Sequence, residues 1–278
     1  MLAAFTSGDL VAGSRLEPAA AVVIALAGWW YLSATRRLAD RGRRWPRRRS
    51  VPYLAGLLVL VVATQSGLAT SDTTSFTAHV FQHLLLGMVA PVLLALGAPV
   101  TLALQTSNRS LRTRLIKVLH SPPVRVLTHP VTAWAAFGGS MFALYFTGLY
   151  ADTLRSTPLH DVTHLAFALS GCLFFWPAVG LDPIPHRLNY GARMLYVLVA
   201  LPFHTILGVA LVTQTKLIAP GLKLSDQQTG AAILWTAGEL LGLTAMMIVA
   251  AQWMTAEERE AVRQDRRLAA AVDTLPVP

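Results

Sequence analysis

The stretch HVFQHLLLGMVAPVLLALGAPVTLALQ, residues 79–105, contains no Asp, Glu, Lys or Arg. A helix of this length rises about 1.5 Å per residue, enough to cross the roughly 30 Å hydrocarbon core of a bilayer. His79 and His83 stand four residues apart at its start, so both imidazoles lie on one helix face. Gly87 and Pro91 continue this face with a small and a kinking residue, which allow a neighbouring helix to approach.

A second stretch, HDVTHLAFALSGCLFFWPAVG at residues 160–180, repeats this pattern. His160 and His164 again stand four residues apart at the start of an apolar run, and Gly171 continues their face. Two helices that each begin with His-x-x-x-His predict one shared site.

The composition is that of an integral membrane protein. Of the 278 residues, 54% are hydrophobic and only 13% are charged, whereas soluble domains carry about 25% charged residues. The apolar runs are continuous rather than alternating, which favours an all-α bundle over a β-barrel. Seven transmembrane helices are predicted, at approximately 18–35, 51–70, 78–104, 131–150, 160–180, 192–213 and 229–254.

Basic residues predict the orientation of these spans. Eight arginines fall between residues 36 and 49, and the positive-inside rule assigns this segment to the cytoplasm. Alternation of seven spans then places 19 of the 23 Lys and Arg residues inside, with the N-terminus outside and the C-terminus in the cytoplasm. The net charge of +9 is therefore explained by topology and contact with the lipid bilayer, and not by binding of nucleic acid.

The predicted organisation has three parts. An external tail (1–17) precedes a transmembrane domain (18–254), and a charged cytoplasmic tail (255–278) follows it. Between the third and fourth spans, leucines and valines recur at helical spacing among basic residues, which predicts a short amphipathic helix on the inner surface. The single cysteine, Cys172, allows no intramolecular disulfide and is interpreted as a packing residue.

The ionisable residues within the spans all lie in the outer half of the predicted membrane. Besides the two histidine pairs, His204 lies about nine residues below the outer end of the sixth span, and Glu239 about ten below the outer end of the seventh. Such residues usually face a partner or a polar cavity, because charge in hydrocarbon is costly. The cytoplasmic half contains none, and no pair of broken helices or internal repeat marks a site at the membrane midplane.

The histidines are the candidate metal ligands. Imidazole suits zinc, copper, iron and nickel, thiolate ligands are absent, and ligand type alone does not separate copper from zinc. Met88 shares a span with the first pair but lies off the histidine face. Three external carboxylates are available to join or tune such a site: Asp72, Asp152 and Asp161. The predicted ligands are His79, His83, His160, His164 and His204, with Glu239 and Asp161 as supporting residues or a proton relay.

Four segments, taken in order, resemble the CtaG-type family of assembly factors for caa3-type cytochrome c oxidase. They are HVFQHLLLGMVAPVLLALGAP at 79–99, HP at 129–130, HDVTHLAFALSGCLFFWPAVGLDP at 160–183 and HTILG at 204–208. The resemblance extends over roughly residues 50–255. It implies a bacterial plasma-membrane protein that is not an enzyme, that is needed to build active oxidase and that has a role in copper supply. It also implies that the five histidines named above match those of the family, His204 being the least certain.

We therefore expect a copper-binding assembly factor that receives the ion on the outer side and passes it to a nascent oxidase subunit. Two other functions fit the histidines. In a haem-binding membrane electron carrier, facing histidines would ligate iron axially. A transporter would move metal ions or protons through the bundle, although the apolar cytoplasmic half argues against it.

Overall fold

Apolar runs separated by proline, glycine and charged turns fold into helices, with no strand among the residues that the computed structural model describes, 17–273. The predicted external tail lies outside these residues except for Glu17. The elements are α1 Pro18–Asp40, α2 Arg47–Gln65, α3 Leu68–Ser71, α4 Phe76–Leu84, the π-helical η1 Leu85–Val89, α5 Ala90–Leu96, α6 Pro99–Thr106, α7 Arg109–Leu119, α8 Pro122–Leu127, α9 Pro130–Phe146, α10 Leu149–Thr153, α11 Thr157–Val179, α12 Tyr190–Leu198, α13 Leu201–Val212 and α14 Leu224–Asp273.

Six helical stretches of the described chain are long and apolar enough to cross a membrane. They are 18–40, 47–71, 76–106, 157–179, 190–212 and 224–268. The chain is therefore a multi-pass helical membrane protein. The predicted fourth span forms α9, which has 17 residues, followed by the short α10. The count of seven spans stays a prediction, as does the orientation of the termini.

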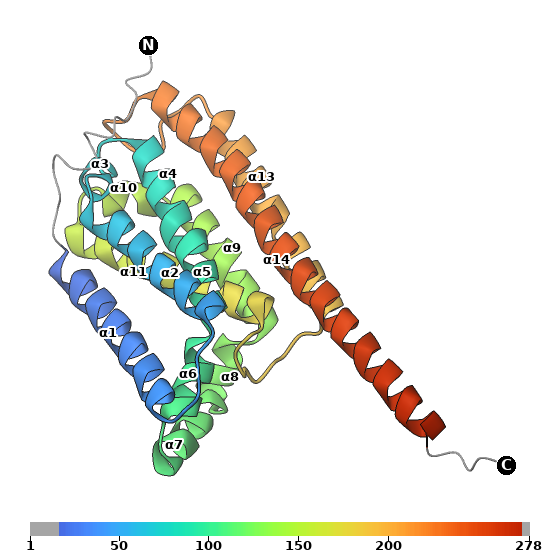
Figure 1. Ribbon diagram of the computed structural model, residues 1–278. Coiled ribbons are helices and arrows are strands. Elements are labelled where there is room, and N and C mark those ends of the chain that lie inside the picture. The colour runs from blue at the N-terminus through green and yellow to red at the C-terminus, as the bar shows by residue number, and fades with distance from the viewer. Residues whose placement is uncertain (1–16, 274–278) are drawn as a thin grey trace.

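The helices form a bundle in which α3 and α10 lie at one end and α7 lies at the other (Figure 1). Near its centre, α11 packs against η1, α5 and α9, while α14 packs against α4 and α13. The main core is rich in aromatic side chains, and a smaller one holds α1 against α2 and α6 around the stacked rings of Tyr31 and Tyr53. This arrangement brings the N-terminal ends of α4 and α11 to the same end of the bundle.

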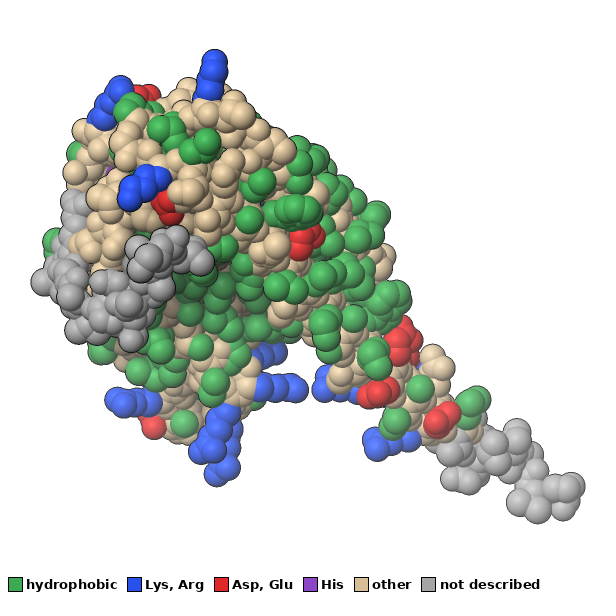
Figure 2. Space-filling model, turned by 90° about the horizontal axis from the view of Figure 1, so that it is seen from above, with side chains coloured by type: hydrophobic (Ala, Val, Ile, Leu, Met, Phe, Trp, Pro, Cys, Tyr) green, Lys and Arg blue, Asp and Glu red, His purple; other side chains and the backbone are tan. Residues whose placement is uncertain are grey.

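Hydrophobic side chains cover much of the outer surface of the bundle. Figure 2 shows them crowded along the flank that leads to the protruding helix, while acidic and basic side chains lie at the upper left, along the lower edge and on the protruding helix itself. On α14, Leu240 and Met247 are more than half exposed, as expected of side chains that face lipid. The charged helix predicted after residue 254 is the continuation of α14, which runs without a break to Asp273.

Three of the spanning stretches are interrupted: 47–71, between α2 and α3, and also 76–106 and 190–212. In 76–106, the Ala90 N–H bonds to the Leu85 carbonyl, the five-residue step of a π-turn, and Pro91 has no N–H to offer the Gly87 carbonyl. In the fifth, 190–212, α12 ends at Leu198 and α13 begins at Leu201. The sequence had indicated no such pair of broken helices. Near Pro202, where a kink was expected, the helix is instead interrupted just before the proline.

The approach of α11 to η1 depends on one glycine. A Cβ atom added at Gly171 would overlap the Gly87 carbonyl group and the Pro91 ring. A Cβ atom at Gly87 would meet the ring of Phe167 at 3.6 Å, which is ordinary van der Waals contact. The close approach expected at these two glycines is present, but only Gly171 requires the absence of a side chain.

Candidate metal centre

The first histidine pair lies on α4, whose start is held by hydrogen bonds to another helix. Ser75 is the N-cap and accepts from the Ala78 N–H, while the Phe76 N–H donates to Asp226 Oδ2 of α14 at 2.6 Å. Four residues of α-helix separate His79 from His83, so their rings lie 3.9 Å apart, measured between centroids. Both side chains are buried.

The second pair lies at the start of α11. Pro158 occupies the first turn of this helix, where a missing N–H costs no hydrogen bond. The rings of His160 and His164 are 4.2 Å apart, and both are buried. The helical spacing that predicts a shared face is thus observed in both pairs.

The two pairs face each other across the packed helices. The rings of His79 and His160 are 6.5 Å apart, and those of His83 and His164 are 5.7 Å apart. The close contact at Gly171, two turns below His164, is what brings the two faces together. The four imidazoles therefore form one cluster, as expected from the sequence.

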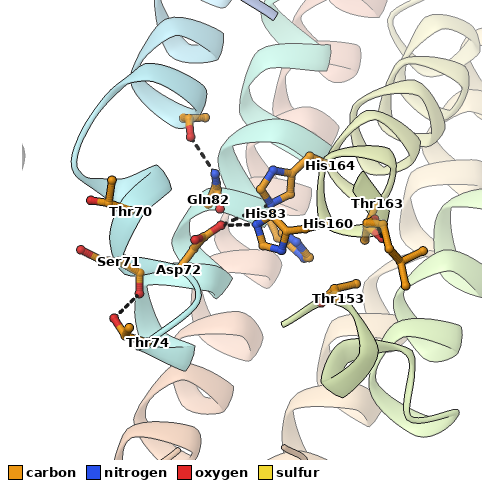
Figure 3. Close-up of polar contacts among 12 residues, drawn as sticks. Thr70, Ser71, Asp72, Thr74, Gln82, His83, Thr153, His160, Thr163 and His164 are labelled. Atoms are coloured by element: carbon orange, nitrogen blue, oxygen red, sulfur yellow. Dashed lines mark hydrogen bonds and ion pairs between the residues drawn. The ribbon is translucent and has the colours of Figure 1, made fainter. Parts of the chain in front are cut away.

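A carboxylate from a third element completes this cluster. Asp72 follows the short helix α3 and has no exposed surface. Its Oδ2 lies 2.6 Å from Nε2 of His160 and 3.5 Å from Nε2 of His164, and Figure 3 shows the carboxylate directed at both rings. One ligand atom from each of these three residues lies within 4.8 Å of the others, close enough to hold one metal ion.

His79 and His83 lie beside this triad. The OH of Tyr145 lies 3.5 Å from Nδ1 of His83, and the ring of Tyr150 lies 4.5 Å from that of His79. Gln82, on the same helix, donates from Nε2 to the Ala63 carbonyl at 2.8 Å and thereby ties α4 to α2. The cluster is therefore surrounded by side chains that keep the imidazoles in place.

Many polar atoms of the cluster lack a hydrogen-bond partner within the described chain. A buried polar atom without a partner costs about 1–3 kcal/mol, and most such atoms in folded proteins are paired. A cation at the centre would be ligated by atoms of this kind, so the donor set fits a metal ion. These atoms are Asp72 Oδ1, both ring nitrogens of His79, His83 Nε2, both ring nitrogens of His164, Gln82 Oε1 and the Tyr150 hydroxyl.

The remaining predicted residues lie elsewhere. The ring of His204 lies against Gly238 of α14, 6.0 Å from the ring of Phe137, and no contact joins it to the cluster in the described chain. Glu239 is half-buried and accepts a hydrogen bond from the Thr205 hydroxyl. Asp161 is exposed on α11. The structure therefore brings together four of the five predicted histidines.

Asp72 is the residue that the sequence did not single out. In the sequence it was one of three external carboxylates. In the structure the other two, Asp152 and Asp161, are exposed, and Asp152 Oδ1 lies 3.8 Å from a guanidinium nitrogen of Arg155. Its position in the polar loop seven residues before His79 was a usable signal. Only the fold of that loop over the ends of α4 and α11 distinguishes Asp72 from Asp152 and Asp161.

A comparison with protein families identifies the chain. The model of the family described as cytochrome c oxidase caa3 assembly factor (Caa3_CtaG) matches residues 29–256. The chain belongs to this family. The matched region of the Caa3_CtaG chain contains Asp72 and every histidine of the cluster.

Three mycobacterial relatives of this Caa3_CtaG protein are described as uncharacterized. The one from Mycobacterium leprae is 36% identical over 257 residues, which is 86% of this chain and 39% of the relative. Those from Mycobacterium bovis and Mycobacterium tuberculosis are each 34% identical over 266 residues, 89% of this chain and 40% of the relative. The chain thus spans about two fifths of the length of the curated relatives that it matches. No solved structure matches it.

Proposed function

We propose that this protein is a non-catalytic assembly factor for cytochrome c oxidase that holds a copper ion at the outer face of the bacterial plasma membrane and delivers it to an oxidase subunit. Membership of the Caa3_CtaG family supports the assembly role. The observation that carries the metal-binding role is the buried triad of Asp72, His160 and His164, with two further imidazoles beside it.

The ligand chemistry supports copper or zinc, and the assembly of an oxidase favours copper. Imidazole nitrogen and carboxylate oxygen suit both ions, and the one cysteine, Cys172, lies two turns of α11 below His164. A cluster at the end of the bundle suits transfer, because ligands near the surface exchange with an incoming partner. The histidines also bind only when deprotonated, so binding is coupled to release of protons.

The packing argues against haem. Neighbouring imidazoles of the cluster have ring centroids 3.9–6.5 Å apart, and Phe167 covers His83 at 4.2 Å. A porphyrin is wider than the spaces between these rings, so haem binding would require α4 and α11 to move apart. A single ion fits between the side chains without such a movement.

The packing also argues against transport. A transporter needs a polar path to the other side of the membrane. Below the cluster, the next small cavity has walls that include the phenyl rings of Phe137, Phe174 and Phe175. The lining of that cavity contains no carboxylate and no Lys or Arg, so it offers no charged path onward to the inner side.

The proposed topology has seven spans, with α9 as the fourth. Since α9 packs against α11 and α13, its 17 residues lie within the bundle, and this length is at the lower limit for a span. The arginines at the α1–α2 turn and on α7 then lie in the cytoplasm. The end that carries α3 and α10 faces outward.

Metal analysis of the purified full chain tests the proposal. We expect about one copper ion per chain at the cluster, and its loss in the variant His79→Ala, His83→Ala, His160→Ala, His164→Ala. The matched control is His120→Ala with His186→Ala, which removes two histidines from the opposite end and is expected to leave copper binding unchanged. In cells, the quadruple variant should lower copper-dependent oxidase activity. Normal copper content and normal oxidase activity in that variant would reject the proposal.

A further inference from the structure

A small cavity inside the bundle has two side chains that can ligate a metal. Its free volume is about 10 Å³, which is room for roughly one water-sized group. Met88 and His204 both line it, and both are buried at 2% exposure. Phenyl rings form much of the remaining wall, and the lining contains no carboxylate.

The imidazole of His204 has a ring nitrogen without a partner. Its Nε2 is buried and has no hydrogen bond within the described chain. The ring cannot easily turn away, because a Cβ atom added at Gly238 would overlap it, so α14 packs directly on the imidazole. Burial of this nitrogen without a hydrogen bond therefore destabilises the fold.

Both side chains come from places where the helix is irregular. Met88 lies within the π-helical segment η1, and His204 lies four residues after the interruption at residues 199–200. π-turns inside α-helices occur frequently at functional sites, and broken helices near the membrane midplane mark ion sites in membrane proteins. The cavity is also lined by Ala200, which belongs to the interruption itself.

We propose that Met88 and His204 form a second site, separate from the outer cluster, that holds one Cu(I) ion. A buried water needs two to four polar partners, and the lining side chains offer only one imidazole and one weakly accepting thioether. That pair instead suits a soft monovalent cation, which accepts few ligands and favours sulfur. The surrounding phenyl faces attract a cation further.

The position of Met88 links this site to the outer cluster. Met88 follows His83 by five residues on one continuous helical stretch, about 7 Å along the axis at 1.5 Å per residue. Cu(I) passes between the sites by exchange of one ligand for another, without change in its oxidation state. The transfer rests on the proposed function, whereas binding at the inner site does not. The inner site therefore serves as a shielded position in which Cu(I) is kept away from water.

Anaerobic titration of the full chain in lipid nanodiscs with Cu(I), against a chromophoric Cu(I) chelator, tests the inference. We expect two ions per chain in the wild type and one in Met88→Leu and in His204→Ala. The variant lacking the four outer histidines should also bind one. The matched controls are Met141→Leu, which changes a buried methionine that does not line the cavity, and Met247→Leu, which changes an exposed one; both should bind two.

Ag(I), a diamagnetic substitute for Cu(I), gives a second measurement on the unaltered chain. With methyl-labelled methionine, the Met88 resonance should shift on addition of Ag(I), while those of Met141 and Met247 stay in place. An unmoved Met88 resonance, or inner-site variants that bind as much Cu(I) as the wild type, would overturn the second site and leave the outer cluster intact. Absence of Cu(I) binding in every form would instead reject both sites.

Discussion

Asp72 and the four histidines around it combine features that rarely coexist in a protein interior. The carboxylate is wholly buried, yet within the described chain its only ion pairs are with His160 and His164, and its Oδ1 has no hydrogen-bond partner. Such groups persist in a bundle where they bind a ligand, because an unpaired polar group is otherwise a cost to folding. The side-chain geometry therefore supports the proposal that Asp72 binds the ion directly.

Replacing Asp72 by Asn tests this role with almost no change in shape. The amide cannot supply a charged oxygen, so we expect copper affinity to fall at least about tenfold, the loss typical of removing a ligand or a residue that orients one. The fold should persist, as measured by thermal unfolding in detergent. Asp152→Asn, which removes an exposed carboxylate, is the control and should bind copper normally.

The two histidine pairs should behave as one unit. We expect His79→Ala with His83→Ala, and His160→Ala with His164→Ala, each to abolish most copper binding at the outer cluster and most oxidase assembly, while the proposed inner site keeps its ion. The quadruple variant should resemble either double variant, because residues of one network are strongly non-additive. Copper bound at the outer cluster, counted as the content above the one ion expected at the inner site, distinguishes this from two independent outer sites, which would give half the loss in each double variant.

Among the elements, α11 and η1 determine whether the pairs can meet. Gly171 faces the Gly87 carbonyl, which Pro91 leaves without its usual helical donor. The π-turn that follows His83 therefore serves packing as well as the inner cavity, since η1 both receives α11 and contains Met88.

Substitution of Gly171 by Ala should separate α11 from η1. Overpacking of a tight core contact costs about 1–3 kcal/mol, so we expect lower thermal stability and weaker copper binding together. Gly87→Ala provides the matched control, because its Cβ atom meets Phe167 at an ordinary 3.6 Å. A Gly171→Ala protein with wild-type stability and copper content would show that the close contact does not position the histidines.

The molecule as a whole separates its two kinds of polar residue by end. The four histidines of the cluster and Asp72 gather at the end of α3 and α10, whereas the arginines before α2 and on α7 lie at the other end (Figure 1). This separation is what a membrane protein with an outer metal site and a basic cytoplasmic surface requires. Because the chain spans about two fifths of the length of its curated relatives, the proposed function is that of this membrane unit.

Reporter fusions test the orientation. A reporter after Pro278 should be active only in the cytoplasm, and one inserted near Asp152 should be active only outside, because the positive-inside rule retains the arginines within the cell. A third fusion in the 41–46 turn, expected in the cytoplasm, serves as the internal control. The reverse pattern would place the histidine cluster on the cytoplasmic side and exclude outer-face delivery.

The sequence alone determined the helical and membrane character of this protein, because both depend on local properties. Continuous apolar runs predict spans whatever their neighbours are, and six of the seven predicted stretches form helices of sufficient length and apolarity. Helical spacing likewise decides that His79 and His83 share a face, and that His160 and His164 do. The resemblance to the assembly-factor family was confirmed by the family match.

Only the tertiary structure decided which of these faces meet. A sequence determines where a residue lies around its own helix, but the rotation of each helix about its axis depends on packing against all the others. That packing buries Asp72 against the histidines and leaves Asp161 on the surface. It also places His204 apart from the cluster, in the lining of a cavity that it shares with Met88, a methionine that lies off the histidine face of its own span. Contacts between distant segments depend on how all the helices pack together, so a local sequence pattern cannot predict them.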